Sequence, residues 1–118
     1  MREIKFRAWH TKREKMVEIK ALHWDLKSQQ IEDIWLRAYT AKPANLILMQ
    51  FTGLKDKHGK EIYEGDIIKH KLENRPLHAI KWDERGYWNL DTEPMLNNAH
   101  ALNSEVIGNI YENPELLK

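Results

Sequence analysis

Four carboxylates fall within eleven residues near the middle of the chain, and they are the first residues whose spacing could support catalysis. They are Asp56, Glu61, Glu64 and Asp66. Paired carboxylates can bind Mg²⁺, and bound Mg²⁺ can promote phosphodiester cleavage. Asp56 and Asp66, however, each adjoin a glycine-containing turn, where aspartate is favoured because its side chain accepts hydrogen bonds from nearby backbone N–H groups. We therefore interpret the stretch as two turns, and we expect no catalytic residue and no enzymatic activity.

The histidine and cysteine content argues against metal and thiol chemistry. The chain has six histidines and no cysteine, which excludes thiol catalysis, disulfide bonds and cysteine-based zinc sites. No two histidines have the i, i+2 or i, i+4 spacing of common metal motifs. His70 and His78 lie on separate predicted strands without a third ligand nearby, which is too few for a zinc site. We expect neither a metal nor a cofactor.

Aromatic residues beside basic ones form a third candidate, a binding surface near the C-terminal half. Trp82 and Trp88 flank a turn at residues 83–86, next to Lys81 and Arg85. Aromatic and basic side chains on a small barrel can stack bases or contact a phosphate backbone. The alternative is core packing of a cross-strand pair, because strand alternation places Lys81 and Trp82 on opposite faces.

A similar combination occurs at the N-terminus. Residues 1–20 contain seven basic and three acidic side chains, an excess of four positive charges. Trp9 lies on the opposite face from Phe6 and Ala8 in an alternating segment, so one face exposes apolar or aromatic surface unless another element covers it. The candidate binding residues are therefore Arg7, Trp9, Lys81, Trp82, Arg85 and Trp88.

Short β-strands with closely spaced turns must position these residues. The pattern predicts a first hairpin over residues 4–19 and a second over residues 21–40 turning near 27–30, with a short helix at 31–38 as the alternative. Residues 46–49 are predicted to be a short strand buried on both faces. Later strands are predicted at 67–72, 78–82, 87–90 and 106–111. Turns are predicted at 56–59, 65–66 and 83–86, and longer connections at 73–76 and 92–104. Asn113 and Pro114 are predicted to begin a helical turn.

The size and charge of the chain predict one soluble domain. Its 118 residues can bury a core without disulfides or metal, and a net charge of +1 marks no general affinity for nucleic acid or membranes. No window is apolar enough for a membrane span, and the first residues do not form a signal peptide. We expect an N-terminal β layer at about residues 1–50 and a barrel-like part at about 60–118, sharing a core.

Three blocks of residues carry a resemblance to a known family. They are Ile4-Lys5-Phe6-Arg7-Ala8-Trp9, the stretch from Thr52-Gly53-Leu54-Lys55-Asp56 to Glu64-Gly65-Asp66-Ile67, and Val106-Ile107-Gly108-Asn109-Ile110-Tyr111-Glu112-Asn113-Pro114-Glu115-Leu116. In this order they resemble the YopX family of small proteins encoded by phages and prophages. The resemblance implies several coiled β-sheets containing an SH3-like barrel, and no established biochemical activity. His10 and His58 depart from the family pattern, which commonly has an acidic residue and Asn there.

We therefore expect a phage- or prophage-encoded, non-enzymatic protein of the bacterial cytoplasm. It would bind a host or phage protein and self-associate as a homo-oligomer, without membrane insertion. The alternative is a nucleic-acid-binding module that uses the SH3-like barrel and the basic N-terminal strand. The feature that separates the two is whether a set of basic residues converges on one face, namely Arg2, Lys5, Arg7, Lys81 and Arg85.

Overall fold

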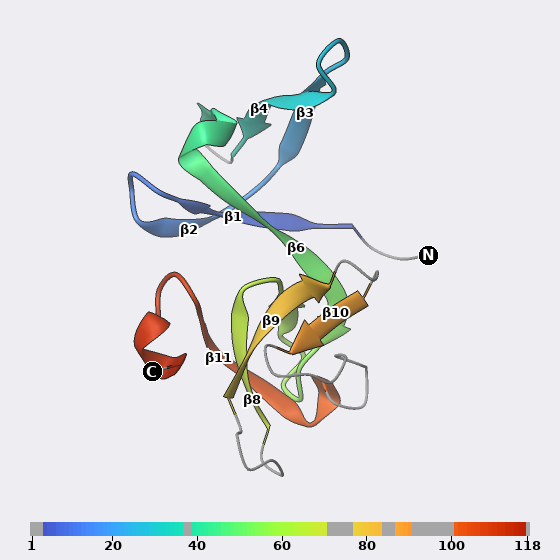
Figure 1. The fold of residues 1–118 in the computed structure, drawn as a ribbon, viewed down its shortest axis with the longest axis vertical. Coiled ribbons are helices and arrows are strands. Elements are labelled where there is room, and N and C mark those ends of the chain that lie inside the picture. Colours follow the sequence, from blue (N-terminus) through green and yellow to red (C-terminus); the bar gives the residue numbers. More distant parts are fainter. Residues whose placement is uncertain (1–3, 37–38, 71–76, 84–86, 91–100, 118) are drawn as a thin grey trace. The chain divides into compact units, whose positions relative to one another are not determined.

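The computed structural model of the chain describes residues 4–36, 39–70, 77–83, 87–90 and 101–117. Antiparallel strands dominate the described part, and they curl into three sheets (Figure 1). This confirms the predicted mainly β fold, whereas an SH3-like barrel at residues 60–118 stays a prediction. The two helical elements described in full are 3₁₀ helices, η1 (Pro43–Asn45) and η2 (Pro114–Leu117). No helix of the described residues has the length and apolar character needed to cross a membrane.

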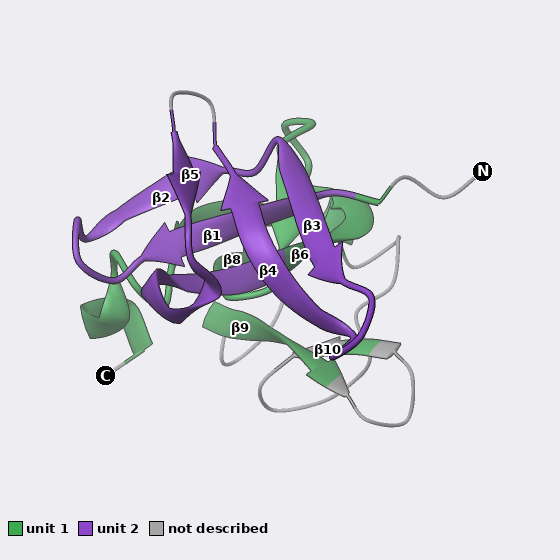
Figure 2. Cartoon of the chain, turned by 90° about the horizontal axis from the view of Figure 1, so that it is seen from above, with its two compact units in different colours: residues 1–4, 50–118 green, residues 5–49 purple. Residues whose placement is uncertain are grey.

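The chain divides into two compact units (Figure 2). Unit 1 comprises residues 1–4 and 50–118, and unit 2 comprises residues 5–49. Each unit has its own cluster of buried apolar residues. The predicted organisation, one domain with a shared core, remains a prediction.

Unit 2 contains both predicted N-terminal hairpins. Its strands are β1 (Phe6–His10), β2 (Lys15–Glu18), β3 (Ala21–Asp25), β4 (Gln30–Trp35) and β5 (Thr40–Ala41). The second hairpin continues into a three-stranded sheet with the order β3-β4-β5. The alternative of a helix at residues 31–38 is wrong as far as Trp35, because these residues belong to β4. Ile34 pairs with Leu22 of β3, and both side chains face the core of the unit. Residues 37–38 lie outside the described part.

The core of unit 2 follows from strand alternation. Ile34 is fully buried, whereas the next residue, Trp35, is 46% exposed. Successive side chains of a strand point to opposite faces, so one face of β4 packs inward and the other faces solvent. The buried members of this core are Ala8, Ile34, Leu36, Ala41 and Leu46.

Strand β6 (Leu46–Lys55) begins in unit 2 and continues into unit 1, where it pairs with β7 (Glu61–Tyr63). The prediction of a short strand at 46–49 buried on both faces is wrong, because the strand has ten residues and Ile47 is 38% exposed. The strand extends through a register irregularity between Phe51 and Lys55, where Gly53 adopts a φ of 87°. Glycine takes this conformation without steric cost, so the bulge lets pairing resume beyond it.

Unit 1 also contains a four-stranded sheet with the order β10-β9-β8-β11. Its strands are β8 (Asp66–His70), β9 (Leu77–Asp83), β10 (Tyr87–Leu90) and β11 (Ser104–Asn109). The core beneath it includes Ile62, Ile68, Ile80, Trp88, Ala101 and Val106. The predicted loop at 73–76, the turn residues 84–86 and most of the 92–104 connection lie outside the described residues.

The last strand ends two residues earlier than predicted. Strand β11 stops at Asn109, whose Oδ1 accepts hydrogen bonds from the backbone N–H groups of Tyr111 (3.0 Å) and Glu112 (2.8 Å). A side chain that satisfies the following backbone in this way favours a turn over further strand pairing. The helical turn predicted at Pro114 is present as η2, although the Asn113 side chain bonds back to the Asn109 N–H (3.2 Å).

Candidate binding surfaces

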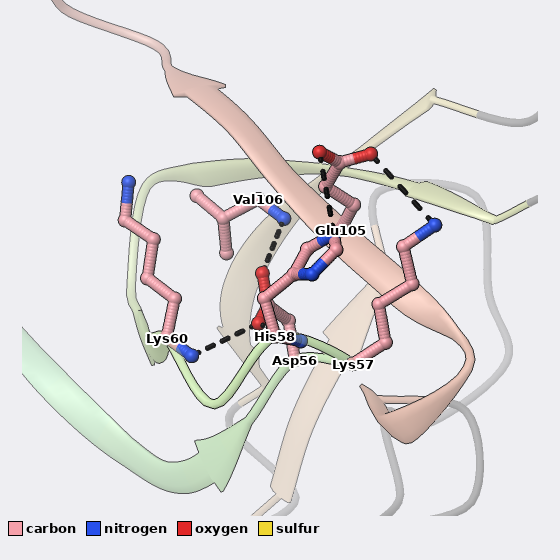
Figure 3. A network of polar contacts seen from close by, with 6 residues as sticks. All are labelled: Asp56, Lys57, His58, Lys60, Glu105 and Val106. Atoms are coloured by element: carbon pink, nitrogen blue, oxygen red, sulfur yellow. Dashed lines mark hydrogen bonds and ion pairs between the residues drawn. The ribbon is translucent and has the colours of Figure 1, made fainter.

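Asp56, the first of the four carboxylates, is committed to holding the fold together. Its carboxylate is almost fully buried and accepts three backbone hydrogen bonds (Figure 3). The N–H groups of His58 (2.8 Å) and Lys60 (2.9 Å) donate to Oδ1, and that of Val106 (2.9 Å) donates to Oδ2. The first two bonds close the turn at residues 56–59 as predicted, and the third fastens that turn to β11.

The electrostatics of Asp56 agree with a structural role. Burial is the largest single influence and raises the pKa of the carboxyl, because a charge is less stable away from water. The backbone donors of Val106, Lys60 and His58, together with the nearby His58 ring, outweigh burial and lower the pKa below its ordinary value. Asp56 is therefore ionised near neutral pH.

Asp66, the last carboxylate of the stretch, and the nearby Glu105 also make contacts within unit 1. Asp66 is 1% exposed, and its Oδ2 accepts a hydrogen bond from the Tyr63 N–H (2.8 Å) within the turn at Gly65. Near the surface, Glu105 pairs with Lys57 (3.9 Å) and His58 (3.6 Å) (Figure 3). Among the described residues no group of three or more histidine, aspartate or glutamate side chains is arranged to hold a metal ion.

The predicted binding residues of unit 1 divide between core and surface. Trp82 and Trp88 are direct partners in the β9–β10 pair, with ring centroids 4.8 Å apart in an edge-to-face arrangement. Trp88 is 6% exposed and belongs to the core, whereas Trp82 is 47% exposed and Lys81 is also exposed. Core packing thus explains Trp88, and Trp82 with Lys81 remains available to a partner. Arg85 lies outside the described residues.

The predicted binding residues of unit 2 are partly covered. Arg7 is half-buried, and its Nη2 lies 3.8 Å from the sulfur of Met49. Trp9 is also half-buried and lies opposite Met16 in the β1–β2 register. Arg7 and Lys81 belong to different units, and Arg2 and Arg85 are outside the described part, so convergence of the basic residues on one face stays a hypothesis.

A surface that the sequence interpretation did not single out lies on the β3–β4 hairpin. Its exposed residues, here called the hairpin patch, are His23, Trp24, Leu26 and Trp35. Alternation along β3 places His23 and Trp24 on opposite faces of the hairpin. Trp24 is 56% exposed and Trp35 is 46% exposed. The rings of His23 and Trp35 lie 4.3 Å apart, so one tryptophan is held in place by its neighbour. Alternation from the buried Ile34 would have revealed Trp35, but the mixed helical and strand spacing of residues 21–40 obscured it.

Comparisons with known proteins agree with this architecture. A family model described as YopX protein matches residues 5–118. The crystal structure of protein EF1440 from Enterococcus faecalis is similar, with a TM-score of 0.80 and 28% sequence identity over 100% of both chains. A comparison with curated proteins found no match.

Proposed function

The chain belongs to the YopX family, and we propose that it acts by binding proteins, including a second copy of itself, without catalysing a reaction. In this proposal it is encoded by a phage or prophage, and it works in the cytoplasm of the bacterial host on a host or phage protein. The observation that carries the proposal is the hairpin patch. Two tryptophans and a leucine, each between 46% and 91% exposed, are concentrated on one short hairpin.

The chemistry of the hairpin patch suits a protein interface. Single exposed apolar residues are common on protein surfaces, but tryptophan is enriched among the few residues that dominate binding energy. Contact between the His23 and Trp35 rings restricts the motion of both before any partner arrives, which lowers the entropic cost of association. Strand β3 is also an edge of its sheet, so its outer backbone groups can pair with a strand from another chain.

The proposal of a non-enzymatic role is supported by the state of the candidate catalytic groups. Asp56 and Asp66 are buried and bonded to backbone N–H groups, so neither is presented to a substrate. Glu105 and His58 lie 3.6 Å apart at the exposed surface. Such contacts stabilise turns and strands and leave neither aspartate exposed to a substrate.

The test is sedimentation velocity of the chain from about 1 to 200 µM. We expect a dimer or higher oligomer, and we expect Trp35→Ser to weaken the association by at least about tenfold, as for a central interface tryptophan. Trp82→Ser is the matched control, because Trp82 has nearly the same exposure (47%) but lies in unit 1. A monomer at every concentration, or an equal effect of both substitutions, would overturn the self-association part of the proposal.

Nucleic-acid binding is a second candidate function, favoured by Lys81 and Trp82. Both side chains are exposed on β9, where alternation places them on opposite faces of the strand, and exposed aromatic and cationic side chains are the kinds that contact bases and phosphates. The test is fluorescence anisotropy of labelled DNA and RNA at two salt concentrations, because contacts to phosphates weaken steeply as salt rises.

A further inference from the structure

The turn between β1 and β2 carries a local excess of positive charge. Residues 12–15 are Lys12, Arg13, Glu14 and Lys15, all exposed, with three positive charges and one negative charge. Within the described part of the chain, no carboxylate forms an ion pair with Lys12, Arg13 or Lys15. The whole chain has a net charge of only +1, so this turn is a local feature rather than part of a general positive field.

The central cation of the turn is held against an aromatic ring. The guanidinium carbon of Arg13 lies 4.4 Å from the centroid of Tyr39, within the range of a cation–π interaction. A guanidinium stacked on a ring has lost much of its rotamer freedom, while its N–H donors at the rim stay available. Such a planar donor group matches the oxygens of a phosphate with two parallel hydrogen bonds.

The backbone that carries Arg13 is also fixed. The buried His10 accepts a hydrogen bond from the Arg13 N–H at its Nδ1 (3.2 Å), and its carbonyl accepts one from the Glu14 N–H (2.8 Å). Thr11 donates from its N–H (2.9 Å) and its hydroxyl (3.2 Å) to the carbonyl of Asn45. Lys15 lies opposite His10 in the β1–β2 register. The cations of the turn are therefore presented on a constrained frame.

We infer that Lys12, Arg13 and Lys15 bind the phosphodiester backbone of a nucleic-acid strand, with Tyr39 holding the arginine in place. The inference rests on the second candidate function, nucleic-acid binding, and assigns it a site in unit 2. Three closely spaced cations favour a ligand whose negative charges repeat at short, regular intervals along a chain. A single carboxylate of a protein partner would satisfy only one of them.

The experiment is fluorescence anisotropy with a labelled 20-nucleotide DNA strand and its RNA equivalent, at about 50 and 200 mM salt. We expect wild-type binding at 50 mM that weakens steeply at 200 mM. Arg13→Gln should weaken binding at 50 mM by about fivefold and lower the salt slope by about 0.7, the contribution of one phosphate contact on a single strand. The affinity of Arg13→Lys should lie between those of the wild type and Arg13→Gln, because lysine keeps the charge and loses the planar stacking.

Two further variants separate the site from its alternatives. Lys27→Gln removes the same charge from an exposed turn elsewhere in unit 2 and should leave binding within about twofold. Equal weakening by Lys27→Gln and Arg13→Gln would overturn the site. Weakening by Lys81→Gln but not by Arg13→Gln would keep nucleic-acid binding and overturn this site.

Other outcomes test the ligand class. Absence of wild-type binding at 50 mM would overturn both the site and the second candidate function. Displacement of the labelled strand by polyglutamate as effectively as by unlabelled DNA would overturn a nucleic acid as the partner. Circular dichroism of each variant establishes that it is folded. If Arg13→Gln fails to fold, weaker binding by a folded Arg13→Lys than by the wild type supports the inference, and equal binding overturns it.

Discussion

The two units turn their strands with different chemistry. Among the described residues of unit 1, the positions with positive φ are glycines, with φ values of 87° at Gly53, 80° at Gly59 and 86° at Gly65. Unit 2 places Glu14 (51°) and Gln29 (59°) in the same region of backbone space, where a side chain is disfavoured. The two turns of unit 2 are built alike, because each has a 2.8 Å bond from this residue's N–H to the carbonyl four residues earlier.

The aspartates at the turns also differ between the two units, in burial and in how far along the chain their hydrogen bonds reach. In unit 1 the buried Asp56 reaches from its own turn to Val106 in a distant strand. In unit 2 the turn carboxylate is Asp25, which accepts bonds from the Lys27 N–H (3.1 Å) and the Ser28 hydroxyl (2.9 Å) at an exposed position. The central and final blocks that carry the family resemblance therefore consist largely of residues used for folding. The surfaces suited to a partner lie mainly outside those two blocks.

The largest effect should come from Asp56→Asn. The amide keeps one oxygen but turns the other into an NH₂ donor, which would face a backbone N–H instead of accepting from it. Because the lost bonds are buried and charge-assisted, the free energy of unfolding should fall by about 3 kcal/mol, measured by urea denaturation.

Asp25→Asn is the matched substitution in unit 2. Its carboxylate is exposed and bonds only within its own turn, so solvent can replace the lost contacts, and the effect should be much smaller. Native-state hydrogen exchange at the Val106 amide should show faster opening in Asp56→Asn alone. An equal fall in the free energy of unfolding for the two substitutions would show that the buried and the exposed aspartate contribute equally to stability.

A smaller, graded effect should appear as the pH is lowered. The pKa of Asp56 in the folded protein lies below its ordinary value, so its carboxylate stabilises the fold fully above the unfolded pKa of about 3.9. This contribution is lost as the pH falls from there through the folded pKa. Urea denaturation between pH 6 and pH 2.5 should show a steeper loss for the wild type than for Asp56→Asn. Parallel curves would mean that Asp56 is not the group responsible.

The smallest effects should have opposite signs in the two units. Gly59→Ala should lower the free energy of unfolding by about 1 kcal/mol, because an added Cβ meets no atom within 4 Å and only the backbone conformation becomes unfavourable. Gln29→Gly should raise it by about 0.5 kcal/mol, because relief at the positive φ exceeds the added entropy of the unfolded chain. Thermal unfolding measures both. Destabilisation by Gln29→Gly would show that its side chain makes a contact that outweighs the backbone term.

Much of the fold could be predicted from residues that are close in the chain. The Asp56-to-Gly59 turn, both N-terminal hairpins and the β9–β10 pair follow from turn residues and alternation over short distances. The prediction for residues 46–49 failed because a run of four apolar residues does not show where a strand ends or which face is covered. The end of β11 was missed because the Asn109 side chain bonds to the backbone beyond it.

The candidate surfaces were less predictable. Trp82 and Trp88 flank the same predicted turn, yet one is half-exposed and the other is in the core. Arg13 and Tyr39 are 26 residues apart, and no local pattern indicates that their side chains stack. Such contacts depend on which strands pair and in which register.

By itself the sequence determined the family, the β class and the position of the glycine and aspartate turns, because these depend on local backbone preferences and side-chain alternation. Only the tertiary structure decided which aromatic rings are exposed and what the carboxylates do. The third donor to Asp56 comes from Val106, fifty residues away, and it turns a plausible metal ligand into a structural residue. Burial and long-range hydrogen bonds are properties of the packed chain, so chemistry that depends on them appears only after folding.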